Sequence, residues 1–173
     1  MKNALYVNLV LLLVAVIWGF GFVPQKLGMQ YLSPAAFNAQ RFALGALTLA
    51  PVMIFMPSVS KTHLLSWPTV KMGAILGALL FGGALLQQVS LLYTSVANVS
   101  FITGLYAVVV PLIAYFLGYR YGALVWLGGV LAIIGLYLMT GGGAPGALKG
   151  DLIAMLGAVI WAVHLLVLSL IHI

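Results

Sequence analysis

Six long apolar stretches constrain this chain more than any other feature of its sequence. They lie near residues 5–23, 35–56, 72–93, 97–117, 122–140 and 151–173. A helix needs about 20 mostly apolar residues to cross the hydrocarbon core of a bilayer, because each residue advances it by about 1.5 Å. The stretches are continuously apolar, whereas the strands of membrane barrels alternate apolar and polar residues. The sequence therefore predicts an all-α integral membrane protein with about six transmembrane helices.

Composition excludes a water-soluble domain. Hydrophobic residues make up 65% of the 173 residues and charged residues 5%, whereas roughly one quarter of a soluble domain is charged. The net charge of +6 comes from cations scattered singly along the chain, so no basic cluster predicts a nucleic-acid partner. The chain has no cysteine, which excludes disulfides, thiol nucleophiles and thiolate metal sites. The expected surroundings are those of a lipid bilayer.

Short breaks separate the apolar stretches, so sequential spans are expected to pack antiparallel. The breaks are Pro24–Pro34, Pro57–Lys71, Thr94–Val96, Tyr119–Tyr121 and Gly141–Lys149. With a cytoplasmic N-terminus, four cations lie inside and two lie outside. The inside cations are Lys2, Lys61, Lys71 and Arg120, and the outside cations are Lys26 and Lys149. The positive-inside rule therefore predicts a multi-pass protein of the cell (inner) membrane with its N-terminus in the cytoplasm.

An internal repeat predicts how the spans are grouped. Residues 15–18 in the first span read Ala-Val-Ile-Trp, and residues 158–161 in the sixth repeat them. Five spans separate the two copies, and an odd repeat unit places its second copy in the opposite orientation, as in many secondary transporters. We therefore expect a first repeat over residues 1–145 and a truncated second repeat over 146–173. Residues 168–173 resemble a translated adapter remnant at the edge of a fragment.

Several short motifs resemble the EamA branch of the drug/metabolite transporter superfamily, and they follow that family's order and spacing over nearly the whole chain. They are Trp18-Gly19, Phe22-Val23, Ser33-Pro34, Arg41-Phe42, residues 92–98, residues 101–106, Pro111-Leu112, Gly128, Gly135 and Gly150-Asp151. The resemblance implies two five-helix halves in inverted orientation. It also implies a transporter whose remaining half is missing here, or a homodimer partner in its place.

Two positions depart from the pattern of the superfamily. The family often carries a glutamate after the glycine that ends span four, but here Gly118 is followed by Tyr119 and Arg120. Small multidrug relatives resemble proton-coupled antiporters that use a glutamate in the first helix, and span one of this chain contains no acid. Neither carboxylate mechanism can be carried over to this sequence.

Arg41 is the one ionised group expected inside a span. Charges at membrane depth cost roughly 2.5 to 3.5 kcal/mol on insertion scales, so they usually face a cavity. The alternative is snorkelling, since Arg41 lies only about 9 Å below the outer interface and helix side chains lean toward the N-terminus. The sequence leaves both interpretations open, and the first makes Arg41 a substrate-pathway residue.

Aromatic and uncharged polar side chains supply the other candidate pathway residues. Aromatic faces accept apolar and cationic ligands, although lipid contact explains most membrane aromatics. Polar groups at membrane depth must bond across helices or contact water. The aromatic candidates are Trp18 and Tyr106, with Phe20 and Phe22 as weaker ones, and the polar set is Asn38, Gln40, Gln87, Gln88, Asn98 and Thr103. Of the polar set, Gln88, Asn98 and Thr103 flank the hairpin of spans three and four and are predicted to face one pathway.

Small residues and a proline predict packing features. Gly73 and Gly77 match the small-residue spacing of close helix contacts, and Gly128 with Ala132 repeats it. Pro111 removes a donor and clashes with the carbonyl of Ala107, so we expect a kink in span four. The three histidines show no metal-ligand spacing, and no metal or cofactor is expected.

Three classes of function compete for such a chain. The leading one is a secondary transporter, an exporter of a small metabolite or drug-like amphiphile. A membrane-embedded enzyme needs convergent acids, histidines or nucleophiles, and one Asp at a span boundary supplies almost none, so no enzyme is expected. The remaining alternatives are a structural or assembly protein without transport, or a half-transporter that works only as a dimer.

Overall fold

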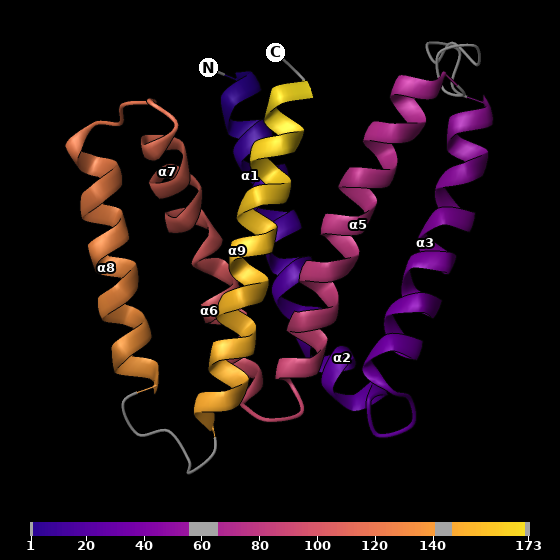
Figure 1. Cartoon of the computed structure of the whole chain (residues 1–173), viewed down its shortest axis with the longest axis horizontal. Helices are drawn as coiled ribbons and strands as arrows, with labels where there is room; N and C mark the ends of the chain where they lie inside the picture. Colours follow the sequence, from indigo (N-terminus) through magenta and orange to yellow (C-terminus); the bar gives the residue numbers. More distant parts are fainter. Residues whose placement is uncertain (1, 56–65, 141–146, 172–173) are drawn as a thin grey trace.

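The computed structural model describes residues 2–55, 66–140 and 147–171, and within these ranges the chain forms helices and connecting turns. Figure 1 shows them as long rods lying side by side. Their bounds are α1 Lys2–Phe20, α2 Phe22–Gly28, α3 Pro34–Phe55, α5 Trp67–Ser90, α6 Val96–Gly104, α7 Tyr106–Phe116, α8 Ala123–Thr140 and α9 Ala147–Ile171.

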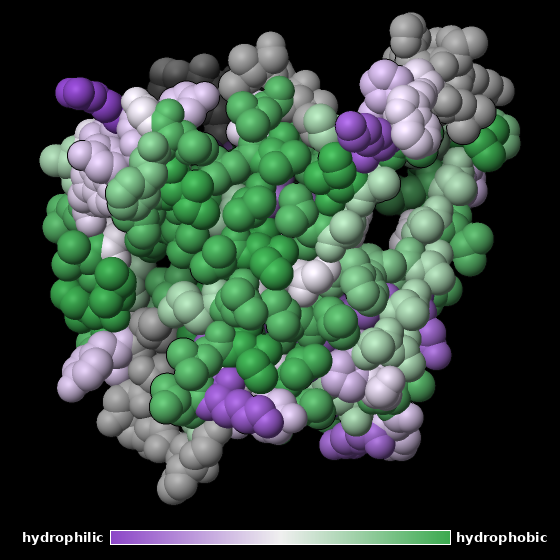
Figure 2. All heavy atoms as spheres, in the orientation of Figure 1, coloured by the Kyte–Doolittle hydropathy of each residue, from purple (hydrophilic) through white to green (hydrophobic). Residues whose placement is uncertain are grey.

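These helices correspond to the six predicted spans. Four helical segments in the described chain are long and apolar enough to cross a membrane, namely Leu5–Gly28, Trp67–Ser90, Val96–Phe116 and Ala147–Leu170. The apolar helix Ala123–Gly135 is shorter, and the 22-residue α3 runs beside α5 (Figure 1). Hydrophobic residues cover most of the face in Figure 2, and most of its hydrophilic residues lie near the two ends. The predicted all-α membrane fold with about six helices is confirmed.

The first span is longer than predicted and is broken at a different residue. The helix continues past Pro24 as α2, which ends at Gly28, and Gly21 is the cap between α1 and α2. The break predicted to begin at Pro24 therefore begins only after Gly28, and that part of the prediction is wrong. Pro24 is the third residue of α2, where a helix has no internal acceptor for the backbone N–H that proline lacks. The interruption at Gly21 therefore makes room for Pro24 inside a helix.

The fourth span is also divided. It forms α6 and α7, which meet at Leu105, and the backbone N–H of Leu105 donates to Ile102 O at 3.1 Å. Pro111 lies inside α7. The kink was predicted at Ala107, whose carbonyl the proline ring approaches, but the helix is interrupted two residues earlier, at Leu105. Similarly, the predicted break Pro57–Lys71 ends early, because α5 begins at Trp67 with Pro68 in its first turn, a position that proline favours.

The last helix runs against the direction of the first. α1 begins, and α9 ends, at the same end of the bundle (Figure 1). α9 packs chiefly along α5, and also contacts α6 and α7. By contrast, α1 contacts little beyond α2, and its described side chains from Leu5 to Phe20 are all exposed. The described helices thus cover α9 well and leave α1 largely uncovered.

Glycines bring α5 and α9 together, but not the glycines predicted for this role. A Cβ on Gly83 would lie 3.1 Å from the Trp161 ring, and one on Gly157 would lie 3.3 Å from Gly83 O. A Cβ on Gly73, Gly77 or Gly128 would meet nothing within 4 Å in the described structure, so the predicted packing role is not found for these three. Their spacing marks a face of small residues, and such spacing does not reveal whether another helix covers that face.

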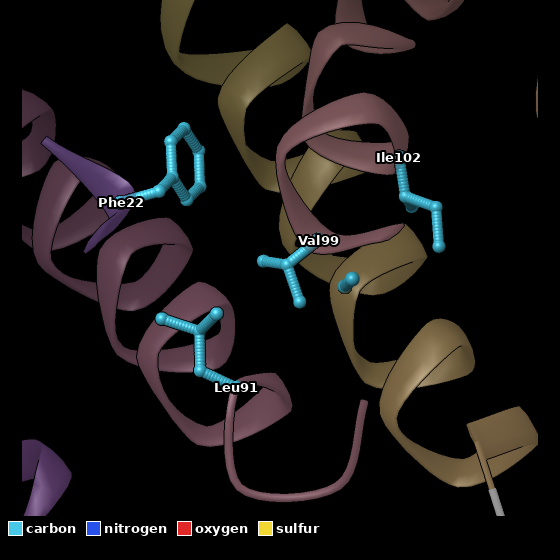
Figure 3. Packing of buried hydrophobic residues seen from close by; sticks show 5 residues of the cluster. Phe22, Leu91, Val99 and Ile102 are labelled. Carbon is cyan, nitrogen blue, oxygen red and sulfur yellow. The ribbon is translucent and has the colours of Figure 1, made fainter. Parts of the chain in front are cut away.

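One end of the bundle is closed by a compact core, which we call the closed end. Phe22, Leu91, Val99, Ile102 and Ala154 form its apolar cluster, drawn from α2, the α5–α6 turn, α6 and α9 (Figure 3). Leu91 and Val99 are fully buried. Because α2 ends and α9 begins here, the cluster lies at the end of the bundle opposite the start of α1 (Figure 1).

Candidate functional site

A cavity of about 820 Å³ lies among the helices, next to the apolar core of the closed end, and Phe22 belongs to both. Its walls come from α1, α2, α3, α5, α6, α7 and α9. Pockets of roughly 300–1,000 Å³ suit small organic ligands, so the cavity has the size of a substrate site. Both interrupted spans reach it, since Gly21 lies in its wall on one side and Gly104 and Tyr106 lie in its wall on another.

Aromatic rings form much of the cavity wall. The set is Trp18, Phe22, Phe42, Tyr106 and Trp161. The rings of Trp18 and Trp161 meet edge to face with their centroids 6.1 Å apart, and these are the two tryptophans of the internal repeat. The absence of a side chain at Gly83 allows the Trp161 ring to lie against α5. The two copies of the sequence repeat therefore meet in the structure, because their tryptophans bring α1 and α9 into contact at the cavity.

A few polar groups interrupt this apolar wall. Gln87 Nε2 donates to Thr103 Oγ1 at 3.1 Å, which ties α5 to α6 at the cavity. Gln25 Nε2 donates to Gly21 O at 3.0 Å beside the helix interruption. The Gln25 Oε1 acceptor is buried and has no hydrogen-bond partner in the described structure. Buried amide oxygens are usually paired, so this one is an unsatisfied acceptor beside the helix interruption.

Arg41 reaches the cavity from the second turn of α3 and is partly buried. Its Cζ lies 5.0 Å from the centroid of the Phe42 ring, a cation–π distance. Within the described chain, no hydrogen bond or ion pair engages the guanidinium. The chain has a single acidic residue, Asp151, and this residue does not line the cavity. The placement meets the geometric condition of a pathway residue, one of the two interpretations that the sequence left open.

The structure brings four of the six predicted pathway residues into the cavity wall, namely Trp18, Arg41, Thr103 and Tyr106. Gln88 and Asn98 are not in it. Gln88 is fully buried and its Nε2 donates to Gln25 O at 3.1 Å, while Asn98 Nδ2 donates to Thr94 Oγ1 at 3.2 Å. Of the three residues predicted to face one pathway, Thr103 alone lies in the cavity wall, because the amides of Gln88 and Asn98 bond to neighbouring segments.

The cavity wall also contains Gln25, Phe42 and Trp161, for which the sequence predicts no pathway role, and Gln87, which belongs to the polar set but not to the three residues predicted to face one pathway. Helical spacing could have predicted Gln25, because it lies seven residues after Trp18 and therefore on the same face of the helix. Gln87 and Gln88 are adjacent and must therefore point to different faces of α5. Sequence alone does not say which of the two faces the cavity.

A second polar cluster lies at the closed end, where the start of α9 meets the α5–α6 turn. Asn98 Nδ2 also donates to Asp151 Oδ1 at 3.4 Å, and the Lys149 ammonium lies 4.0 Å from the centroid of the Tyr93 ring. From the other side, Lys26 Nζ donates to Leu91 O. These contacts hold the start of α9 and the end of α2 against one turn.

Metal-ligating side chains do not converge in the described chain. No group of three or more His, Cys, Asp or Glu residues gathers there. His164 Nδ1 lies 3.1 Å from Leu76 O, between α9 and α5, whereas His63 and His172 fall outside the described residues. The cavity thus offers recognition groups, namely rings, amides and one cation.

Comparison with known proteins gives two consistent matches. The model of the EamA-like transporter family matches residues 5–141. An uncharacterized transporter of Archaeoglobus fulgidus is 33% identical over 167 residues, which cover 95% of this chain and 49% of the relative. The chain therefore spans about half the length of the curated relative that it matches. No solved structure matches the chain significantly.

Proposed function

The chain belongs to the EamA-like transporter family, and we propose on that basis that it forms one half of a secondary transporter whose substrate pathway is the cavity described above. The observation that carries this proposal is the cavity itself, because its aromatic walls and few polar groups are typical of small-molecule sites. The substrate class is a small metabolite or drug-like amphiphile, and the proposed membrane is the inner or plasma membrane.

Three observations support a second half with inverted orientation. α9 runs opposite to α1 and carries the second copy of the repeat. The two repeat tryptophans meet at the cavity, as expected for a substrate site between inverted repeats. In addition, α1 lacks cover among the described helices. Residues 1–145 then form the first repeat, residues 146–173 begin the second, and the uncovered face of α1 receives helices of the second half.

The proposed direction of transport is export, with the N-terminus in the cytoplasm. The apolar core lies at the closed end, and the access that we propose for the cavity is from the side on which α1 begins. A cavity open to the cytoplasm is where an exporter collects its substrate. Lys2, Lys71 and Arg120 flank helix ends on that side, and Lys26 and Lys149 flank the other, which supports this orientation through the positive-inside rule.

Single cysteines test the orientation cleanly, because the chain contains no cysteine of its own. Leu148→Cys lies at the start of α9 and Tyr121→Cys in the α7–α8 connection, and both positions are exposed. In intact cells we expect an impermeant thiol reagent to modify Leu148→Cys and to leave Tyr121→Cys unmodified until the membrane is opened. The reverse labelling pattern contradicts a cytoplasmic N-terminus.

Water access to the cavity distinguishes a transport pathway from a packed structural protein. Ser100 lines the cavity, whereas Thr48 is exposed on α3 and does not. We expect a water-soluble thiol reagent to modify Ser100→Cys rapidly in opened membranes, because thiols react as thiolates and need a polar environment. The control Thr48→Cys, which faces lipid, is expected to react at least about tenfold more slowly. Equal inertness of both cysteines contradicts the proposed pathway.

A further inference from the structure

We propose that the cavity selects organic anions with an apolar or aromatic body, and that the Arg41 guanidinium binds their anionic group. This inference rests on the proposed function and deepens it by naming the substrate class. The cavity wall contains one cation, Arg41, and no carboxylate. The only acidic side chain of the sequence, Asp151, is bonded to Asn98 at the closed end instead.

An unpaired cation at this depth is costly unless something compensates it. Arg41 is partly buried, and its one described interaction is with the ring of Phe42. Intramembrane charges normally pair with an opposite charge or with water in a cavity. With no acid of this chain in the cavity wall, an anionic ligand is the charge partner that the site lacks. Binding such a ligand neutralises the charge of the guanidinium at this depth.

The chemistry of the other wall residues defines the rest of the ligand. Trp18, Phe22, Tyr106 and Trp161 present ring surfaces, which bury apolar and aromatic groups. Rings alone also attract cations, so the aromatic wall by itself does not choose between charges. Arg41 makes this choice, because a cationic ligand in the same cavity meets a like charge in a medium that screens it poorly.

A guanidinium is suited to carboxylates, since it grips one with two parallel hydrogen bonds, and an ammonium cannot reproduce that geometry. The competing explanation is snorkelling, in which Arg41 only reaches toward the interface about two helical turns away. Snorkelling makes no distinction between arginine and lysine and predicts no ligand preference. The two accounts therefore differ in what substitution and ligand charge do to binding.

Three compounds with one body and three charges test the proposal directly. 3-Phenylpropionate, 3-phenylpropanamide and 3-phenylpropylammonium are titrated against the complete protein that contains residues 1–173, in phosphatidylcholine nanodiscs, with tryptophan fluorescence as the readout. Trp18 and Trp161 line the cavity, so a bound phenyl group alters their emission. We expect the anion to bind at least about tenfold more tightly than the amide, the gain typical of a charged hydrogen bond. The ammonium is expected to bind most weakly.

Substitutions assign the preference to Arg41. Arg41→Gln should reduce the affinity for the anion to that for the amide, and Arg41→Lys should retain only part of the preference. Arg120→Gln is the matched control, because Arg120 is exposed in the α7–α8 connection, and it should bind all three compounds as the wild type does. Helical content from circular dichroism verifies that each variant is folded.

Each other outcome overturns a different statement. Similar affinities for the three compounds, or an unchanged preference in Arg41→Gln, overturn anion selection and leave the cavity as a neutral substrate site. If none of the compounds binds, the proposed substrate class is overturned, whereas the proposed transport function is decided independently by flux of other compounds. Titration in phosphatidylglycerol nanodiscs separates a soluble anion from a lipid headgroup. Unchanged binding supports the proposal, and suppression of binding by the anionic lipid assigns Arg41 to the headgroup and overturns it.

Discussion

Gly150→Val is expected to detach the start of α9 from the α5–α6 turn and to lower the midpoint temperature of thermal unfolding by several degrees. Gly150 is buried in the first turn of α9. A Cβ at this position would lie 2.8 Å from Thr94 Cβ and 2.9 Å from both Thr94 Cγ2 and the Thr94 backbone nitrogen. Real Cβ atoms do not approach other heavy atoms so closely, so either the turn or the helix must move.

The turn has little freedom to move. The Thr94 backbone N–H donates to Ser90 O at 3.1 Å, and Thr94 Oγ1 accepts from Asn98. Displacing α9 in turn separates Asp151, the next residue, from Asn98. Overpacking of this kind costs roughly 1–3 kcal/mol, and each kcal/mol lowers the midpoint of a domain of this size by about 2–4 °C.

The measurement is thermal unfolding in detergent, followed by circular dichroism. Gly77→Val is the control, because Gly77 is a mid-helix glycine of α5 where a Cβ would contact nothing within 4 Å. Its midpoint should match the wild type or exceed it, since glycine is a poor residue for a helix interior. If the two variants melt at the same temperature, the close contact between Gly150 and Thr94 does not support the fold.

The sequence contained most of the fold because apolar length is a strong signal in a membrane protein. Six spans with short breaks leave few arrangements other than an antiparallel bundle, and the structure has one. The helix interruptions were harder to place. Pro24 and Pro111 were the visible signals, yet the chain breaks at Gly21 and Leu105, because a proline needs altered hydrogen bonding in the turn before it.

The candidate site was only partly predictable for a different reason. Arg41 and Trp18 stand out in the sequence as a rare charge and as half of a repeat, and both line the cavity. Choosing Gln88 over Gln87 required the rotation of α5 about its axis, which its neighbours set. The contacts of Gly73 and Gly77 likewise depend on which helix lies opposite, and residue spacing within one helix carries no information about that.

The second large effect concerns transport itself. We expect residues 1–173, reconstituted alone into vesicles, to insert but to show no saturable flux. The reason is that the cavity is bounded on one side by α1, whose side chains are exposed in the described structure, and inverted-repeat transporters bind substrate between two halves. The relative from Archaeoglobus fulgidus is about twice as long, since the match covers 49% of it.

The most direct test of the central claim, that this chain supplies one half of a transport pathway, is a flux measurement made in parallel on two proteins. One set of vesicles carries residues 1–173, and the other carries the complete coding frame that contains them. Both sets are offered the same panel of labelled anions, cations and neutral metabolites. We predict saturable uptake of at least one compound by the complete protein and none by residues 1–173. Saturable uptake by residues 1–173 alone contradicts the two-half account and indicates that two copies assemble, and background flux in both sets contradicts the transporter account altogether.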